Sequence, residues 1–225
     1  MNIKAIIFDL DGVICHTDQY HFQAWKQLAD RLGIPFDERD NDRLRGVSRM
    51  ESLNIVLEKS PRVYSTLEKL AFAEEKNETY KRLLLQMTPV DVPEETLSTL
   101  RELRGRGLLL AIGSSSKNTK LILSRLGLAD FFDAVADGTE ITHSKPDPEV
   151  FLLAAQKLGV SPAVALVVED ADAGIAAAKA GEFFTAGIGP AAMNPGADIS
   201  LVTLTDLLLY RMPKRSVQIF CNFTP

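Results

Sequence analysis

The spacing of hydrophobic residues changes period along the chain, and these changes outline the expected elements. Residues 4–10 (KAIIFDL) form a nearly continuous apolar run, which is typical of a strand buried on both faces of a parallel sheet. Residues 18–91 are predicted to be almost entirely helical. One apolar stripe with helical spacing consists of Phe22, Trp25, Leu28, Ala29 and Leu32. Gly33 is expected to end that helix.

After residues 88–93 (TPVDVP), strands alternate with helices of about ten residues. Short apolar runs predict strands at 108–113, 132–137, 163–170 and 183–189. Amphipathic segments predict helices at 94–107, 117–126, 147–159 and 172–181. This alternation indicates βαβ units, a parallel sheet and right-handed crossovers.

The helical block at 18–91 interrupts that alternation after the first strand. We therefore expect an α/β fold, with a Rossmann-like parallel sheet as its core and an inserted helical cap domain. The core domain would comprise residues 1–14 and 92–225, and the cap domain residues 15–91, joined by linkers near 12–18 and 88–93.

Composition narrows the class of protein. The chain has 225 residues, 46% of them hydrophobic, which is enough for a sizeable core. A net charge of −5 without a dense basic run argues against nucleic acid or a membrane as the main partner. No apolar run reaches the length of a membrane span. Cys15 and Cys221 lack metal-type spacing, so a cytoplasmic protein with reduced thiols is expected.

Chemically active side chains stand at the carboxyl ends of the expected strands. They are Asp9 and Asp11 after the first strand, Ser114, Ser115 and Ser116 after 108–113, Lys145 before the helix at 147–159, and Glu169 and Asp170 at the end of 163–170. In open parallel α/β sheets, ligands bind at the carboxyl edge of the strands. These four groups should therefore converge at one place.

The converging groups are chemically coherent. Clustered carboxylates require a cation, and hard oxygen ligands suit Mg²⁺, which usually serves a phosphate. Lys145 adds a positive charge, and Pro146 should keep it out of the helix, in extended backbone. Ser116 and Asn118 lie where the helix at 117–126 is expected to start, a position that suits an anion. The set predicts Mg²⁺-dependent chemistry on a phosphate.

Each signal has a common alternative explanation when it is taken alone. Asp-x-Asp-Gly after a strand is also a turn sequence. Ser116 or Asn118 alone is more often a helix cap, and Glu169 and Asp170 alone are a favourable helix start. A lone lysine is usually a surface residue. The functional interpretation rests on all four groups meeting at one sheet edge in this order.

Four segments resemble the motifs of the haloacid dehalogenase-like superfamily in order and spacing. They are FDLDGV, the serine after LLLAIG, the lysine of SKPDPEVF, and VVEDADAGI. The resemblance covers residues 1 to about 190. It implies a helical cap inserted after the first strand, in agreement with the hydrophobic pattern.

Further segments resemble the β-phosphoglucomutase family within that superfamily. They are YHFQAWKQLA, RGVSRMESL, EEKNETY and SSSKNTK, and in that family these elements grip a phosphorylated hexose. The resemblance implies phosphoryl transfer through an aspartyl phosphate with Mg²⁺. The expected reaction interconverts β-glucose 1-phosphate and glucose 6-phosphate through β-glucose 1,6-bisphosphate.

The resemblance also implies roles for the core residues. Asp9 would be the nucleophile and Asp11 the general acid/base, while Ser114 and Lys145 would bind the transferring phosphoryl group. The ligands of Mg²⁺ would be Asp9, the backbone carbonyl of Asp11, Glu169 and Asp170. Physical chemistry agrees, because carboxylates are covalent nucleophiles for phosphoryl groups and a second carboxylate two residues on shares the strand's face.

The same resemblance assigns substrate contacts. Arg49 offers a planar fork to the distal phosphate. The core partners for that phosphate would be Ser116, Lys117 and Asn118, and Ser115 would also bind the substrate. The sugar site would be lined by Gly46, Val47 and Ser48. Additional expected site residues on the helical segment are Thr17 at the hinge, His21, Trp25 and Lys76. His21 would assist Asp11 or position the hinge, whereas Trp25 is equally compatible with the core and Lys76 with a solvated helix.

Two other functions remain open from the sequence. A phosphatase acting on a sugar phosphate or phosphoglycolate would use the same carboxylates and Mg²⁺ with water as acceptor, although it would not need a second phosphate site. A catalytically inactive phosphosugar-binding protein is disfavoured, because every catalytic position is filled.

Some features depart from the family pattern. His16 stands where an acidic residue is usual, and the tail at 214–225 does not resemble a family ending. The expected partner is a small phosphorylated sugar, bound by a monomer.

Overall fold

A six-stranded parallel sheet forms the centre of the protein. The computed structural model describes residues 2–44 and 47–210, and it orders the strands β3-β2-β1-β4-β5-β6. The strands are β1 (Ala5–Phe8), β2 (Leu109–Gly113), β3 (Ala134–Ala136), β4 (Ala165–Glu169), β5 (Phe184–Ile188) and β6 (Ile199–Leu201). This arrangement confirms the predicted α/β class with a parallel sheet core.

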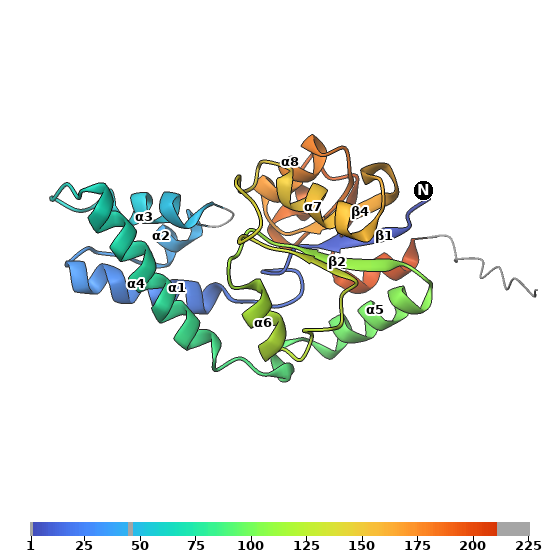
Figure 1. The fold of residues 1–225 in the computed structure, drawn as a ribbon, viewed down its shortest axis with the longest axis horizontal. Helices are drawn as coiled ribbons and strands as arrows, with labels where there is room; N and C mark the ends of the chain where they lie inside the picture. Colours follow the sequence, from blue (N-terminus) through green and yellow to red (C-terminus); the bar gives the residue numbers. More distant parts are fainter. Residues whose placement is uncertain (1, 45–46, 211–225) are drawn as a thin grey trace, which may run out of the picture.

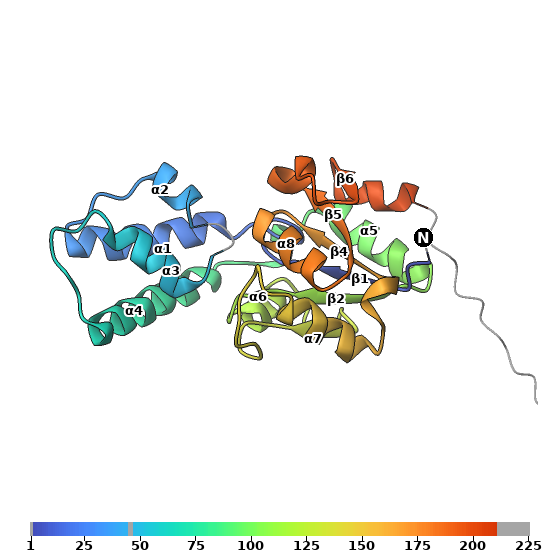
Figure 2. The ribbon, with the colours of Figure 1, turned by 90° about the horizontal axis from the view of Figure 1, so that it is seen from above.

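Helices cover both faces of this sheet (Figures 1 and 2). One face packs on α7 (Glu149–Leu158) and α8 (Asp172–Ala180), and the other on α5 (Glu94–Gly105) and α6 (Thr119–Arg125). Short 3-10 helices complete the core: η1 (Pro89–Asp91), η2 (Pro162–Val164), η3 (Gly189–Met193) and η4 (Leu204–Leu209). The central strand is therefore shielded from water on both sides.

The sequence of β1 explains its central position. Side chains alternate along a strand, so Ala5 and Ile7 enter the cluster beneath α7 and α8, while Ile6 and Phe8 enter the opposite cluster. All four are fully buried, as the continuous apolar run predicted. Phe8 pairs with Ile112 of β2 and Val168 of β4, so the next residue, Asp9, emerges between two neighbouring strands.

Four helices lie to one side of the sheet as a bundle, which we call the cap (Figures 1 and 2). They are α1 (Asp18–Leu32), α2 (Glu38–Asp42), α3 (Arg49–Leu57) and α4 (Thr66–Leu84). The cap has its own hydrophobic cluster, which includes Trp25, Leu28 and Leu53. Gly33 ends α1 with φ of 69°, in the left-handed conformation that glycine adopts readily.

The structure corrects several element bounds. Strand β6 was not predicted, because its three residues are too few to carry a periodic signal. Helix α6 begins at Thr119 rather than at residue 117, and no side chain caps it. The strands are shorter than their apolar runs suggested. The tail at 214–225 lies outside the described residues, and the exact division into domains stays a prediction.

Within residues 2–44 and 47–210, no helix is both long and apolar enough to cross a bilayer.

Candidate active site

Asp9 and Asp11 lie where the strand order reverses. The chain runs from β1 towards β2 and β3 on one side and returns through β4 to β6 on the other, so the order reverses between β1 and β4. In open α/β sheets, ligands bind beyond the carboxyl ends of the strands at such a reversal. The amide of Asp9 donates to the carbonyl of Val168 at 2.9 Å, which anchors Asp9 to β4. Asp9 is only 7% exposed. Sheet topology therefore places the first carboxylate at a position that suits ligand binding.

Lys145 offsets part of the negative charge at this edge. Its Nζ donates to Oδ1 of Asp9 at 2.5 Å and also to Oε1 of Glu169. All three side chains are buried, and the peptide between Lys145 and Pro146 is cis. Burial alone would lower the pKa of Lys145, but Asp9 and Glu169 together raise it, so the ammonium stays charged. The buried positive charge offers an electrostatic partner to an anion at Asp9.

A group of three carboxylates could hold a metal ion. One ligand atom each of Asp9, Glu169 and Asp170 lies within 4.8 Å of the others. An added Cβ at Gly12 would lie 2.0 Å from Oδ2 of Asp170, and one at Gly174 would lie 1.9 Å from the Glu169 carboxyl carbon. The two carboxyl groups thus lie against glycines that leave them room. Clustered carboxylate oxygens are the donor type that Mg²⁺ prefers, so the residues present fit this ion.

The electrostatics of the cluster reveal its unbalanced negative charge. Burial, followed by the charge of Asp9, raises the pKa of Asp11 to about 7 and that of Asp170 to about 8. Burial also raises the pKa of Glu169 to about 7, against the opposing effect of Lys145. These carboxyl groups hold protons more tightly than isolated ones because their charges repel one another in a dry site. A bound cation would relieve that repulsion.

The loop after β2 lies at the same carboxyl edge of the sheet. Ser114 is 3% exposed, and its Oγ accepts from the amide of Ser116 at 3.2 Å. The amide of Asn118 donates to Oγ of Ser116 at 3.2 Å, which tightens the loop before α6. The Oγ of Ser115 is buried, and it has no hydrogen-bond partner among the residues that the structure describes. Lys117 is exposed.

Cap residues meet the core at Asp11. Thr17, at the start of α1, donates its hydroxyl hydrogen to Oδ1 of Asp11. Tyr80 of α4 donates in turn to Oγ1 of Thr17 at 3.1 Å. Thr17 was expected at this junction from the sequence, whereas Tyr80 was not. The second carboxylate is therefore held by a hydroxyl chain from the cap.

A cluster of nitrogen-bearing side chains lies deeper in the cap. Nζ of Lys76 lies 2.9 Å from Nδ1 of His21, which stacks on Tyr80 with a 4.1 Å separation of ring centroids. The same Nζ lies 4.8 Å from the ring centroid of Trp25. Burial and the nearby charge of Arg49 lower the pKa of Lys76 to about 7, while the aromatic faces favour its charged form.

Arg49 and His21 lie in the same electrostatic environment as Lys76. Burial lowers the pKa of Arg49, and burial followed by Lys76 lowers the pKa of His21 well below its usual value. Arg49 has a distant carboxylate partner, since its Nη1 lies 3.9 Å from Oε2 of Glu74. Burial thus disfavours the charged forms of Arg49, His21 and Lys76, and an anionic ligand beside them would stabilise those charges.

The result differs for each of the other expected substrate contacts. Trp25 is 2% exposed within the cap's hydrophobic cluster, so its described contacts are those of a core residue beside Lys76. Ser48 caps α3, because its hydroxyl accepts from the amide of Glu51 at 3.3 Å. Val47 is half-buried beside it. Gly46 lies outside the described residues.

Asn77 and Tyr80 are the contact residues that sequence reasoning missed. Both lie on α4 close to Lys76, and Tyr80 is one full turn beyond it on the same face. Nδ2 of Asn118 donates to Oδ1 of Asn77 at 3.0 Å, which links the loop after β2 to the cap. The available signal was helical spacing from Lys76, since residues at i and i+4 share a face.

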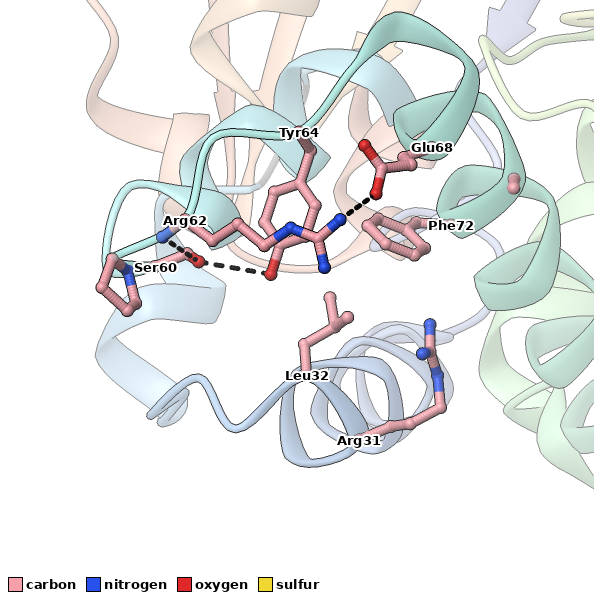
Figure 3. A pocket seen from close by; sticks show the side chains of 9 residues that line it. Arg31, Leu32, Ser60, Arg62, Tyr64, Glu68 and Phe72 are labelled. Carbon is pink, nitrogen blue, oxygen red and sulfur yellow. Dashed lines mark hydrogen bonds and ion pairs between the residues drawn. The ribbon is translucent and has the colours of Figure 1, made fainter.

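A cavity of about 530 Å³ opens in the cap, away from the carboxylates (Figure 3). Its lining includes Arg31, Arg62, Tyr64 and Phe72. Arg62 already pairs with Glu68, as Figure 3 shows, and Arg31 pairs with Glu75. The cavity holds none of the strand-end residues, so the chemistry of the site points to the sheet edge instead.

Comparisons with known proteins agree with this geometry. The family model for haloacid dehalogenase-like hydrolases matches residues 3–181. The chain is 42% identical to a β-phosphoglucomutase of Bacillus subtilis (strain 168), covering 92% of each chain. It is 34% identical to the fructose-1-phosphate phosphatase YqaB of Escherichia coli (strain K12), covering 78% of this chain and 91% of the relative.

A solved structure supports the same relationship. The crystal structure of β-phosphoglucomutase from Clostridium difficile superposes with a TM-score of 0.84 at 38% identity, covering 91% of this chain and 93% of the other. Sequence and fold thus agree over most of the molecule. The chain belongs to the haloacid dehalogenase-like hydrolase family.

Proposed function

We propose that the protein is a Mg²⁺-dependent β-phosphoglucomutase. It would interconvert β-glucose 1-phosphate and glucose 6-phosphate through β-glucose 1,6-bisphosphate. The observation that carries the proposal is the pairing of two features: a nucleophile site at Asp9 and a cationic cap region around Arg49 and Lys76. A bisphosphate has two anionic ends, and these two features match them.

Asp9 would be the nucleophile, forming an aspartyl phosphate. Its carboxylate is fixed by Lys145, whose ammonium would also offset charge on the transferring phosphoryl oxygens. Ser114 would donate to the same phosphoryl group. Asp9, the carbonyl of Asp11, Glu169 and Asp170 would hold Mg²⁺, which would neutralise negative charge as a Lewis acid.

Asp11 would be the general acid/base for the sugar hydroxyl. Its raised pKa, about 7, keeps both protonation states accessible near neutral pH, as this role requires. Thr17 occupies Oδ1 as a donor, so Oδ2 is the oxygen left to exchange a proton with the substrate. As the sugar hydroxyl attacks the aspartyl phosphate, its proton would pass to Oδ2 of Asp11. A new bond would form between the sugar oxygen and phosphorus, and the bond between phosphorus and Asp9 would break, which releases the Asp9 carboxylate.

The opposite end of the substrate would contact the cap and the loop after β2. Arg49 would bind the distal phosphate together with Ser116, Lys117 and Asn118. Lys76 has no carboxylate within ion-pair distance in the described part of the chain, so a phosphorylated ligand would supply its missing counter-charge. Val47 and Ser48 would lie beside the sugar.

A sugar-phosphate phosphatase is the second candidate. It is favoured by the 34% identity to a fructose-1-phosphate phosphatase. It would use Asp9, Asp11 and Mg²⁺ in the same way, with water accepting the phosphoryl group.

One assay separates the two functions. The protein is given β-glucose 1-phosphate, Mg²⁺ and a trace of glucose 1,6-bisphosphate, and both glucose 6-phosphate and free phosphate are followed. The mutase should form glucose 6-phosphate with little phosphate. Stoichiometric phosphate release with little isomerised sugar would reject the mutase and support the phosphatase.

A further inference from the structure

We propose that Tyr80 is a positioning residue for catalysis, because its hydroxyl orients Thr17 towards the general acid/base Asp11. The inference rests on the proposed function only in taking Asp11 as the proton carrier. It adds a residue of cap helix α4, distant in sequence, to the control of that proton.

The hydrogens of these two bonds are donated in one order, from Tyr80 to Thr17 and from Thr17 to Asp11. A tyrosine hydroxyl and a threonine hydroxyl each have one hydrogen to donate. Thr17 gives its hydrogen to Oδ1 of Asp11, so the hydrogen between Thr17 and Tyr80, across 3.1 Å, comes from Tyr80. Donation by Tyr80 to Oγ1 of Thr17 leaves the threonine hydrogen committed to Asp11.

Both hydroxyl groups in this series of hydrogen bonds are shielded from water. Thr17 is 0% exposed and Tyr80 is 1% exposed, so water does not compete readily for either hydroxyl. Without the Tyr80 hydroxyl, Oγ1 of Thr17 would lose its donor in a dry site, and the threonine hydroxyl could turn away from Asp11. The orientation of the Asp11 carboxyl would then be less well defined.

The ring of Tyr80 is fixed independently of its hydroxyl. It stacks on His21 at 4.1 Å between centroids, and Nζ of Lys76 lies 4.6 Å from its centroid. A Tyr80→Phe variant keeps these ring contacts and removes only the oxygen. The hydroxyl's contribution can therefore be measured apart from packing.

The hydrogen bond from Thr17 leaves one carboxyl oxygen of Asp11 for proton exchange. With Oδ1 of Asp11 accepting from Thr17, proton exchange with the substrate hydroxyl is directed to Oδ2. Tyr80 acts through Thr17, because its hydroxyl donates to Thr17 and not to Asp11. Its removal should therefore lower kcat while KM changes little.

A double-mutant cycle tests the proposal. Steady-state rates with β-glucose 1-phosphate and Mg²⁺ are measured for wild type, Tyr80→Phe, Thr17→Val and the double variant. We expect Tyr80→Phe to lower kcat about three- to tenfold, the range for one lost neutral hydrogen bond, with KM within about twofold. In the Thr17→Val background, Tyr80→Phe should lower kcat less than about twofold, because the Thr17 hydroxyl that Tyr80 orients is absent.

Tyr64→Phe is the matched control. Tyr64 is another cap tyrosine, whose hydroxyl oxygen accepts from Ser60 at 3.3 Å beside the cavity of Figure 3. Losing that hydroxyl should leave kcat unchanged. An unchanged kcat in Tyr80→Phe, or an equal effect of Tyr80→Phe with and without Thr17, would overturn the proposal.

The two hypotheses fail differently. If wild type releases phosphate instead of isomerising the sugar, the mutase is rejected, and the same cycle is then read from phosphate release. Coupling between Tyr80 and Thr17 would still support the positioning role, and independence of their effects would still reject it.

Discussion

Nδ2 of Asn118 donates a hydrogen bond to Oδ1 of Asn77 across 3.0 Å, joining the loop after β2 to cap helix α4. Both side chains are 6% exposed, so this amide pair is shielded from water. The contact orients the Asn118 amide and leaves its second N–H for another acceptor. It ties the cap to the loop proposed to bind the distal phosphate.

Asn77→Ala should weaken binding of the distal phosphate. The Asn118 amide would lose its fixed orientation, so KM for glucose 1,6-bisphosphate should rise about fivefold, while hydrolysis of p-nitrophenyl phosphate, which has one phosphate, should be unchanged. Asn54→Ala is the control, since Asn54 bonds only the surface Lys69 among its described contacts, at 2.8 Å. Equal loss with both substrates would contradict this specific role.

Asp9→Asn should abolish turnover while preserving the fold. The amide keeps the volume and the position after β1, but it lacks the carboxylate needed to form an acyl phosphate. Product formation should fall by at least about 10³-fold, within the range that loss of a covalent nucleophile produces. Circular dichroism and the thermal midpoint would verify folding, and substantial residual turnover would show that the nucleophile lies elsewhere.

Lys76→Met should stabilise the protein near neutral pH. The pKa of Lys76, lowered to about 7, means that the unfolded chain binds more protons between pH 7 and pH 10.5. The cost of burying Lys76 is therefore full below pH 7 and disappears as pH approaches 10.5. We expect the variant to gain roughly 1–3 kcal/mol in free energy of unfolding at pH 6, and progressively less above pH 7.

Urea denaturation at several pH values would measure this gain. Lys81→Met is the control, because Lys81 is partly exposed and paired with Glu78 at 2.7 Å. It should change stability by less than about 0.5 kcal/mol. A gain for Lys76→Met that does not decrease above pH 7 would rule out burial of the ammonium as its cause.

Mg²⁺ should stabilise the protein more at pH 8 than at pH 5.5. The pKa values of Glu169 and Asp170, raised to about 7 and 8, mean that the metal-free folded chain retains protons that the unfolded chain releases. Metal-free stability therefore falls as pH rises through this range, and Mg²⁺ no longer competes with protons above it. Thermal shifts with Mg²⁺ or EDTA would measure the difference, and Asp170→Asn should reduce it.

Gly12→Ala should damage the proposed metal-binding region more than Gly33→Ala. Gly12 has φ of 81°, and an added Cβ would lie 2.0 Å from Oδ2 of Asp170. Gly33 has φ of 69°, but beyond its chain neighbours no described atom lies within 4 Å of that position. Gly33→Ala should cost about 1 kcal/mol from backbone strain alone, whereas Gly12→Ala should cost more and diminish the Mg²⁺ thermal shift. Equal effects would exclude the collision with Asp170.

The periodicity of the sequence was sufficient to predict the α/β class, the parallel sheet and the helical segment after β1. Buried parallel strands need continuous apolar runs, so Ala5–Phe8 was recognisable without tertiary information. The carboxyl ends of such strands must meet at one edge. This rule alone predicted that Asp9, Lys145 and Glu169 would lie together.

Contacts between the cap and the core were decided only by the tertiary structure. No local pattern shows that Tyr80 reaches Thr17, or that Asn77 reaches Asn118, because these pairs are 63 and 41 residues apart. Trp25 had equal claims to core and site by spacing, and packing placed it in the cap's hydrophobic cluster. The sequence determined which groups meet at the edge of the sheet, while long-range packing decided which side chains of the cap contact them.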